Sequence, residues 1–123
     1  MNCLSLNVRG IGEDIKVKWV RRLQAKHNIN FMGLQETQLN NFSSININGC
    51  WGTDTYDYDG VNATGRSGGL ISIWDPTFFQ KSTTLKSRFY LIIIGKWKDV
   101  PGNTIFANIY GPQSLGDKKK SLE

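Results

Sequence analysis

Cysteine and histidine are scarce in this chain. Its 123 residues include only two cysteines, Cys3 and Cys50, and one histidine, His27. Two cysteines cannot build a disulfide framework, and together with one histidine they cannot complete a four-ligand zinc site. Cys3 also lies inside an apolar segment. We therefore expect two free thiols, no disulfide partner and a reducing compartment.

Long apolar segments are also missing. No apolar run approaches the roughly 20 residues that a membrane-spanning helix needs. The N-terminus lacks the basic segment followed by an apolar stretch that is typical of a secretory signal. We therefore expect a soluble, intracellular protein of the nucleus or cytoplasm, with no membrane partner.

The chain does contain enough apolar material for one core. Hydrophobic residues make up 39% and aromatic residues 11% of a sequence that has the length of a single domain. Lysine and arginine (15) exceed aspartate and glutamate (10), which gives a formal net charge of +5. This excess favours a polyanionic partner such as nucleic acid, although basic residues often form only a solvated face.

The first third of the sequence predicts a strand, a helix and a second strand. Residues 3–8 and 29–35 are apolar strand segments, and residues 14–27 have helical periodicity. The short connections imply a parallel strand pair with a right-handed crossover. We expect the helix to bury a stripe made of Ile15, Trp19, Val20, Leu23 and, in part, His27. We interpret the basic row of Lys18, Arg22 and Lys26 as solvated surface rather than as a phosphate-binding row.

The remainder of the sequence predicts mainly strands. Asn48-Gly49 is a turn signal before a short strand around residues 50–53, and residues 54–67 have the composition of a long loop. Residues 69–74, 88–97 and 104–110 are strand segments. No repeat or linker interrupts the sequence, so we expect one folding unit.

Three polar side chains follow predicted strands. Asn7 ends the first strand, Glu36 follows the second, and Tyr110 ends the last. Ligands collect outside the carboxyl ends of parallel strands, and the crossover places Asn7 and Glu36 at one edge. Tyr110 joins them only if its strand runs parallel to the first two, which the sequence does not establish. A glutamate after a strand is also a common surface residue, and a terminal tyrosine a common cover for a core.

These residues have the chemistry of a metal and phosphate site. A carboxylate can hold Mg²⁺, which takes one or two protein carboxylates and keeps positions for water and phosphate. Asn7 can add a carboxamide oxygen or hold Glu36 in place. The hydroxyl of Tyr110 can donate to a phosphate oxygen whose charge grows during attack.

The motifs around these residues resemble a known superfamily. The segments LSLNVRG, INFMGLQET, RSGGLISIW and IFANIYGPQ follow one another along nearly the whole chain. Together they resemble the endonuclease/exonuclease/phosphatase superfamily, and most closely the apurinic-type endonuclease domain of plant LINE (non-LTR) retrotransposon polyproteins. The first two motifs are specific in combination, and the last two are supportive.

The resemblance implies roles for individual residues. Glu36 matches the magnesium-binding glutamate of the superfamily, Asn7 the asparagine beside it, and Tyr110 the tyrosine that contacts the scissile phosphate. Gln113 stands where the superfamily usually has an asparagine, so we expect a substrate contact there, with Arg9 as another. The implied cofactor is Mg²⁺, with Mn²⁺ as a substitute, and the implied substrate is the DNA phosphate backbone.

The resemblance also implies an incomplete domain. We expect an α/β fold, the N-terminal half of a four-layer, DNase I-like α/β sandwich, with one mixed sheet and an amphipathic helix. Residues 1–123 would form a single partial domain that stops before the superfamily's Asp-x-Asn and Ser-Asp-His motifs. We therefore expect an inactive fragment whose sheet leaves its inner face exposed. Its partner would be the missing C-terminal half or the reverse transcriptase domain of the parent polyprotein.

Two other interpretations remain open. The chain could be a non-catalytic basic module that binds nucleic acid or a partner through Arg9, Lys16, Arg22, Lys26 and Lys118 to Lys120. It could instead belong to a related phosphatase or phosphodiesterase that shares the metal-binding glutamate. His27 does not replace the missing catalytic histidine in any of these interpretations, because it lies in the predicted helix.

Overall fold

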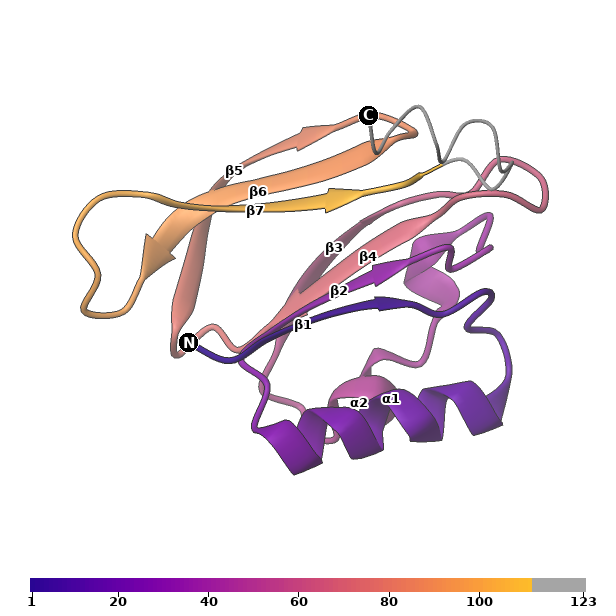
Figure 1. Ribbon diagram of the computed structural model, residues 1–123, viewed down its shortest axis with the longest axis horizontal. Coiled ribbons are helices and arrows are strands. Elements are labelled where there is room, and N and C mark those ends of the chain that lie inside the picture. Colours follow the sequence, from indigo (N-terminus) through magenta and orange to yellow (C-terminus); the bar gives the residue numbers. More distant parts are fainter. Residues whose placement is uncertain (112–123) are drawn as a thin grey trace.

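The computed structural model describes residues 1–111 as three stacked layers, with helices on one side of two sheets (Figure 1). The elements in chain order are β1 (Cys3–Asn7), α1 (Asp14–His27), β2 (Phe31–Gln35), the 3-10 turn η1 (Phe42–Ser44), α2 (Ile47–Trp51), β3 (Asp57–Val61), β4 (Leu70–Trp74), β5 (Phe79–Lys86), β6 (Tyr90–Trp97) and β7 (Thr104–Ile109). The first sheet has the strand order β1-β2-β4-β3, and the second has the order β5-β6-β7.

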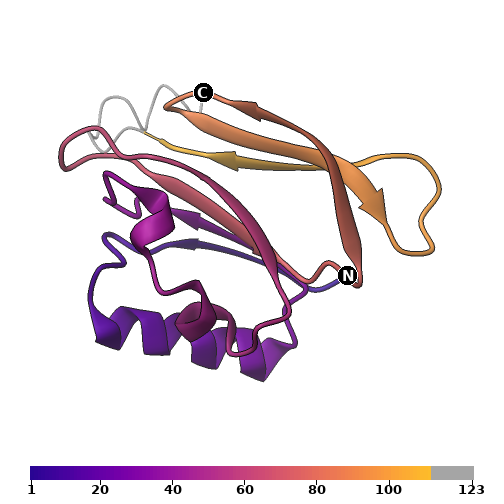
Figure 2. The same ribbon diagram turned by 180° about the vertical axis from the view of Figure 1, so that it is seen from behind.

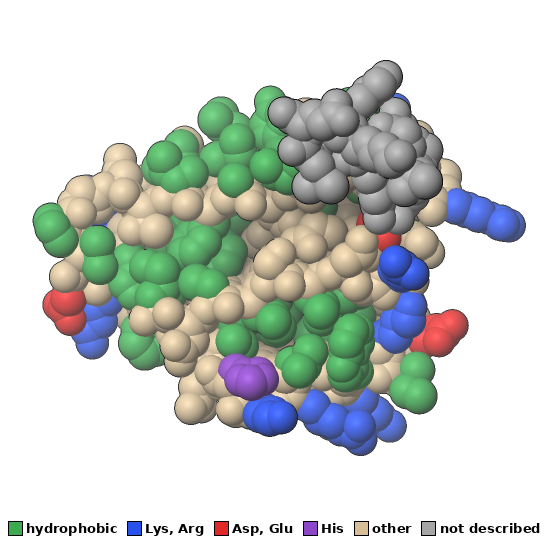
Figure 3. All heavy atoms as spheres, viewed as in Figure 1, with side chains coloured by type: hydrophobic (Ala, Val, Ile, Leu, Met, Phe, Trp, Pro, Cys, Tyr) green, Lys and Arg blue, Asp and Glu red, His purple; other side chains and the backbone are tan. Residues whose placement is uncertain are grey.

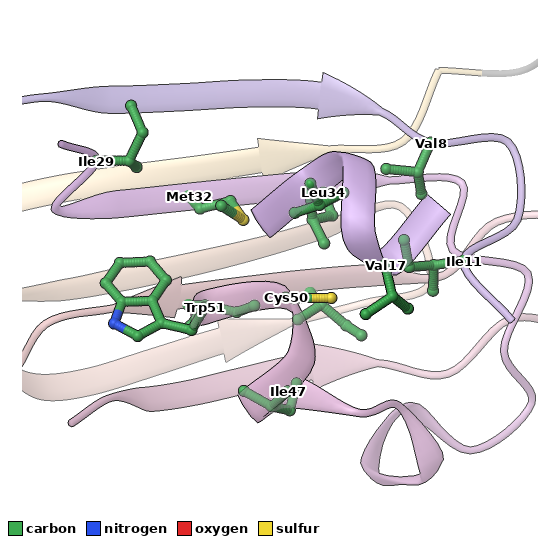
Figure 4. Close-up of a cluster of buried hydrophobic side chains, with 12 residues drawn as sticks. Val8, Ile11, Val17, Ile29, Met32, Leu34, Ile47, Cys50 and Trp51 are labelled. Atoms are coloured by element: carbon green, nitrogen blue, oxygen red, sulfur yellow. The ribbon is translucent and has the colours of Figure 1, made fainter. Parts of the chain in front are cut away.

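The first sheet contains the predicted βαβ unit. β1 pairs with β2 in parallel, and β4 lies antiparallel between β2 and β3, so this sheet is mixed as expected. α1 and α2 cover one of its faces and enclose a core (Figure 4). That core includes Val8, Ile11, Val17, Met32, Leu34, Ile47 and Trp51. The strands alternate, so every second side chain points into it.

The second sheet covers the other face of the first (Figures 1 and 2). A second core of buried aromatic and aliphatic side chains lies between the sheets, consisting of Phe31, Leu70, Trp74, Phe79, Leu91, Ile93 and Trp97. The Phe31 and Phe106 rings stack across the layers with their centroids 3.7 Å apart. The α/β class is confirmed. The expected single sheet was wrong, because residues 79–109 form a three-stranded second sheet over that face. The inner face is therefore largely covered, although Cys3, Ser5 and Asn7 of β1 remain exposed.

Helix α1 has the predicted bounds but is rotated relative to the predicted stripe. Its buried residues are Val17 and Val20, whereas Ile15 is 72% and Trp19 is 42% exposed. His27 is exposed as well. At about 100° per residue, Ile15 and Trp19 lie on the side of the helix opposite Val17. The rotation follows from the docking of Val17 and Val20 in the core beside Ile11, which precedes the helix.

Two segments of the middle region also differ from expectation. The predicted strand around residues 50–53 is the end of α2, which Asn46 caps by accepting a hydrogen bond from the Gly49 N–H at 2.9 Å. The predicted long loop contains β3, and β5 was not predicted. β3 and β5 are edge strands that lack the apolar signal of the central strands: β5 is largely polar and exposed, and β3 contains two aspartates and a glycine.

Both cysteines are free in this structure. Cys3 is exposed at the start of β1, and Cys50 is buried in α2. Burial raises the pKa of the Cys50 thiol to about 11. Within residues 1–111 no helix has the length and apolarity to cross a bilayer.

Candidate functional site

The candidate site lies where β1 and β2 end side by side. Asn7 is the register partner of Gln35. Backbone pairing continues past both strands, because the Gly10 N–H donates to the Glu36 carbonyl at 2.7 Å. The Ile11 N–H likewise donates to the Thr37 carbonyl at 3.1 Å. The parallel crossover therefore places the backbones of residues 7 and 36 at the same rim, as the sequence predicted.

The loop before β4 closes this rim on its other side. The Thr37 N–H donates to the Gly69 carbonyl at 3.1 Å, and the Gln38 N–H donates to the Gly68 carbonyl at 3.0 Å. Gly68 and Gly69 have φ angles of +81° and +90°, which favour glycine. A Cβ atom on Gly69 would also collide with the Thr37 hydroxyl. The two glycines of the RSGG sequence therefore permit the close approach of this loop to residues 37 and 38.

Backbone strain is concentrated at the rim. Arg9, Glu36 and Gln38 have φ angles of 47°, 54° and 58°. Within residues 1–111 only two other non-glycine residues are left-handed, and these are Asn28 at a helix end and Asp99 in a turn. Left-handed conformations of residues other than glycine are costly and cluster at functional sites. Their convergence around Glu36 is a structural reason to treat the rim as a site.

The Glu36 side chain lacks a partner in the described part of the chain. The residue is 5% exposed, and no group within residues 1–111 donates a hydrogen bond or forms an ion pair with its carboxylate. Its carboxylate oxygens are not among the buried side-chain atoms that lack a partner, so they are in contact with solvent and are free to bind a ligand. Asn7 is exposed, and its Oδ1 accepts one hydrogen bond, from the Arg9 N–H at 3.2 Å. That oxygen keeps a lone pair for a further interaction.

Tyr110 reaches the same rim from the second sheet. β7 ends on the side where β1 and β2 end (Figure 1). The Tyr110 N–H donates to the Phe89 carbonyl at 2.8 Å, and the two rings stack at 6.3 Å. The Tyr110 ring faces Gly68, since a Cβ there would lie 3.8 Å from Cε2. Gly68 in turn pairs with Gln38, so Tyr110 lies close to the loop that follows Glu36. β7 therefore runs in the same direction as β1 and β2, which the sequence left open (Figure 1). This direction is the one that brings Tyr110 to the rim.

The basic candidates at the rim have different environments. Arg9 is exposed, whereas Lys16 of α1 donates from Nζ to the carbonyls of Val8 at 2.9 Å and Arg9 at 2.7 Å. Lys16 therefore braces the end of β1 instead of projecting as a free cation. A groove of about 280 Å³ is lined by Arg9, Glu13, Lys16 and Gln38, among others, but not by Glu36. Gln113, the other expected substrate contact, lies outside the described residues.

The oxygen atoms at the rim fit a hard cation. Within residues 1–111 no group of three or more His, Cys, Asp or Glu side chains gathers in one place, so a zinc-type centre has no ligands there. One unpartnered carboxylate and one carboxamide oxygen match the small number of protein ligands around Mg²⁺, which keeps several waters. The donor set at this rim is therefore compatible with a hydrated magnesium ion.

Comparison with known proteins supports the fold. No family model and no curated protein matches the sequence. Similar solved structures include the AP endonuclease LMAP of Leishmania major (TM-score 0.66, 15% identity) and the APE2 catalytic domain of Xenopus laevis (TM-score 0.67, 12% identity). A conserved protein of unknown function from Enterococcus faecalis has a TM-score of 0.70 at 14% identity.

This chain covers about half of each similar structure. The alignments include 96%, 98% and 99% of this chain, but 42%, 48% and 57% of the Leishmania, Xenopus and Enterococcus chains, respectively. The chain therefore has the α/β, DNase I-like fold expected from its motifs, and it spans about half of that fold.

Proposed function

We propose that this chain supplies the metal-binding and phosphate-binding rim of a Mg²⁺-dependent DNA endonuclease of a LINE-type retroelement. The observation that carries the proposal is the carboxylate of Glu36, which has no protein partner within residues 1–111 and remains open to solvent, at a strained rim that also holds Asn7 and Tyr110. The fold shared with two AP endonuclease structures supports a nuclease. The retroelement branch is supported by the NVRG and GLQET motifs of the sequence.

Each rim residue has a role in this proposal. Glu36 holds the metal through its carboxylate, and the Asn7 Oδ1 either adds a ligand or orients Glu36. When bound, the metal supplies Lewis-acid stabilisation of phosphate charge. The Tyr110 hydroxyl donates to a non-bridging phosphate oxygen, where negative charge develops. Arg9, exposed at the mouth of the rim, binds a neighbouring backbone phosphate, and Gln113 contributes a further substrate contact.

The general base of the reaction comes from outside residues 1–111. The only histidine, His27, lies at the far end of the first sheet, because the His27 carbonyl accepts a hydrogen bond from Asn2, which precedes β1. When catalytic groups act as a unit, removal of one of them lowers the rate of the catalysed reaction by several orders of magnitude. We propose that this chain alone is inactive, and that its partner is the remaining half of the domain, in a polyprotein with a reverse transcriptase.

Metal binding tests the rim directly. Isothermal titration calorimetry with Mn²⁺ should show one binding site on the protein. Mg²⁺ should compete with Mn²⁺ for this site. Glu36→Gln keeps the size of the side chain but removes its charge, and it should abolish that site. Asp54→Asn is the matched control, since it removes a carboxylate from an exposed loop. Equal Mn²⁺ affinity in the wild-type protein and Glu36→Gln would refute the proposed metal site.

A nicking assay tests the need for the remaining half. Residues 1–123 should convert supercoiled plasmid to the open-circular form no faster than Glu36→Ala, with Mg²⁺ or Mn²⁺ present. Metal-dependent nicking that Glu36→Ala abolishes would show that the described rim suffices for activity. The retroelement assignment is tested separately: an Asp-x-Asn, a Ser-Asp-His and a reverse transcriptase signature should follow in the downstream reading frame of the gene.

A non-catalytic nucleic-acid-binding role is the second candidate. It is favoured by the exposure of Lys18, Arg22 and Lys26 along α1, where basic side chains gather in Figure 3. In that case DNA binding should weaken steeply with salt and be indifferent to Mg²⁺. Replacement of the three residues by glutamine should weaken binding more than Glu36→Gln does. A larger loss of binding in Glu36→Gln than in the triple glutamine variant would favour the metal-dependent rim. Hydrolysis of small phosphorylated compounds by the whole protein would instead favour a phosphatase.

A further inference from the structure

The apolar space between the two sheets contains one buried amide. Asn108 of β7 is 5% exposed and lies on the inward face of that strand. Its Nδ2, which carries two N–H donors, lies within hydrogen-bond distance of three acceptors: the Leu34 carbonyl at 3.2 Å, the Ile71 carbonyl at 3.1 Å and the Ser72 hydroxyl at 3.3 Å. A single side chain of the second sheet is thus bonded to two strands of the first.

The amide of Gln35 completes this cluster. Gln35 Nε2 donates to Asn108 Oδ1 at 2.8 Å, and the same group lies within hydrogen-bond distance of the Ser5 hydroxyl at 3.1 Å and the Gly33 carbonyl at 3.2 Å. Gly33 is tightly enclosed, since a Cβ there would lie 3.4 Å from Asn108 Nδ2. Hydrogen bonds in such a network polarise one another, so the shared contact between the two amides fixes both side chains.

The positions of the two amides in the chain relate them to the rim. Gln35 immediately precedes Glu36, and Asn108 lies two residues before Tyr110 on the same face of its strand. The Gln35–Asn108 hydrogen bond therefore joins the strand that presents the carboxylate to the strand that presents the phenol. These strands belong to different sheets, and no backbone ladder connects them.

An apolar pair could fill the same space without the cost of burying the Asn108 amide and partly burying that of Gln35. Buried polar groups retained at such a cost can fix the register of packed elements, which apolar contacts alone specify less tightly. We propose that Gln35 and Asn108 are positioning residues, and that their hydrogen bond sets the separation of Glu36 from Tyr110. This inference rests on the proposed function, in which both rim residues act on one phosphate.

The test measures the position of Tyr110 with and without metal. In protein with ¹³C-labelled tyrosine rings, an NOE between the Tyr110 ring and the Gly68 Hα reports the position of the ring. Mn²⁺ bound at Glu36 broadens ring signals according to distance. Gln35→Met removes the donor but keeps an unbranched side chain of similar length. The NOE and the broadening of Tyr110 should both fall several-fold, while Mn²⁺ affinity stays close to that of the wild-type protein.

Two further variants guard against loss of folding. The double variant Gln35→Met/Asn108→Leu leaves no amide unpaired, so it should remain folded and show the same displacement of Tyr110. Ser72→Ala removes one acceptor and should give a smaller change in the same direction. Gln80→Met is the matched control, since this exposed glutamine of the second sheet makes no hydrogen bond through its side chain within residues 1–111.

The two hypotheses fail in different ways. If Gln35→Met and the double variant keep the wild-type NOE and the wild-type broadening, the amides are ordinary core contacts and the positioning role is wrong. If the wild-type protein has no Mn²⁺ site that depends on Glu36, the proposed function is wrong. In that second case the metal-free NOE still decides whether the amide pair positions Tyr110.

Discussion

The hydroxyl of Thr37 occupies the space that a Cβ atom on Gly69 would need. Thr37 is fully buried directly after Glu36, and its N–H donates to the Gly69 carbonyl at 3.1 Å. The position of the residue that follows the candidate metal ligand therefore depends on the absence of a side chain at Gly69.

Gly69→Ala is expected to destabilise the protein by about 3 kcal/mol or more, because steric overlap in a rigid site adds to the cost of a left-handed alanine. Gly65→Ala separates these two effects. Gly65 has a φ of +63°, and a Cβ atom there would meet no other atom within 4 Å, so only the conformational cost of about 1 kcal/mol should remain. Urea unfolding of both variants measures the difference, and equal losses would show that Thr37 yields without cost.

The carboxylate of Glu36 should contribute to stability only when metal is bound. Because its oxygens are in contact with solvent, Glu36→Gln in EDTA is expected to change the free energy of unfolding by no more than about 0.5 kcal/mol. Excess Mn²⁺ should stabilise the wild-type protein but not this variant. Thermal unfolding with and without metal checks both effects. Asp54→Asn should change the free energy of unfolding by less than about 0.5 kcal/mol, both in EDTA and in excess Mn²⁺.

The rim could be predicted from the sequence because its main determinant is local. The strand-helix-strand pattern of residues 3–35 fixes a right-handed crossover, and the crossover brings Asn7 and Glu36 to one edge. Tyr110 could be assigned a position only conditionally, since its strand joins a different sheet. Gln35 and Asn108 were missed because a single amide within an apolar strand has no distinctive local pattern.

Other parts of the fold depend on packing that the sequence pattern leaves ambiguous. β3 and β5 are polar edge strands, and their pairing is decided by the strands beside them. In α1, the apolar positions are compatible with two stripes, one through Ile15 and Trp19 and one through Val17 and Val20. The docked neighbours of the helix select the second stripe.

The rotation of α1 has a measurable consequence for stability. Val20→Ala leaves a cavity in the core between α1 and the first sheet, so it is expected to lower the free energy of unfolding by about 2 kcal/mol. Ile15→Ala, on the exposed side, should cost less than about 0.5 kcal/mol. Urea unfolding of the two variants decides between the stripes. A larger loss of unfolding free energy for Ile15→Ala than for Val20→Ala would show that the helix buries Ile15, as the sequence predicted.

The ion pairs of Asp59 should make stability depend on acid pH. Burial opposes ionisation of this carboxyl, but the hydrogen bond and charge of Lys86, the Gly60 N–H and the charge of Lys81 outweigh it, so its pKa is lowered. A lowered pKa in the folded state stabilises the protein above the unfolded pKa, near 4, and this stabilisation is lost as pH falls through the folded value.

Replacement of Asp59 tests this dependence. Asp59→Asn should cost on the order of 1 kcal/mol at pH 7 and progressively less below pH 4, since the wild-type carboxyl is then protonated too. Asp57→Asn, an exposed carboxylate on the same strand, is the control. Chemical unfolding at pH 7, 5, 4 and 3 supplies the measurement. A cost for Asp59→Asn that stays constant over this range would contradict the assigned role of its charge.

The outer face of the second sheet should make the isolated chain associate. Tyr90, Ile109 and Ile105 are 39%, 62% and 63% exposed, and they share that face because Tyr90 pairs with Ile109 and Ile94 with Ile105. No helix within residues 1–111 covers them, whereas α1 and α2 cover the outer face of the first sheet (Figure 1). Exposed apolar patches of this kind promote association.

Lysine substitution on this face should therefore reduce association. The double variant Ile105→Lys/Ile109→Lys is expected to bind less of the dye ANS and to sediment as a monomer at concentrations where the wild-type protein self-associates. Ile15→Lys replaces an isoleucine of α1 that is even more exposed, at 72%, and should leave association unchanged, because that residue lies outside the sheet face. If both variants reduce association equally, general charge repulsion explains the effect. If only the sheet variant does, the outer face of the second sheet is the surface through which the chain associates.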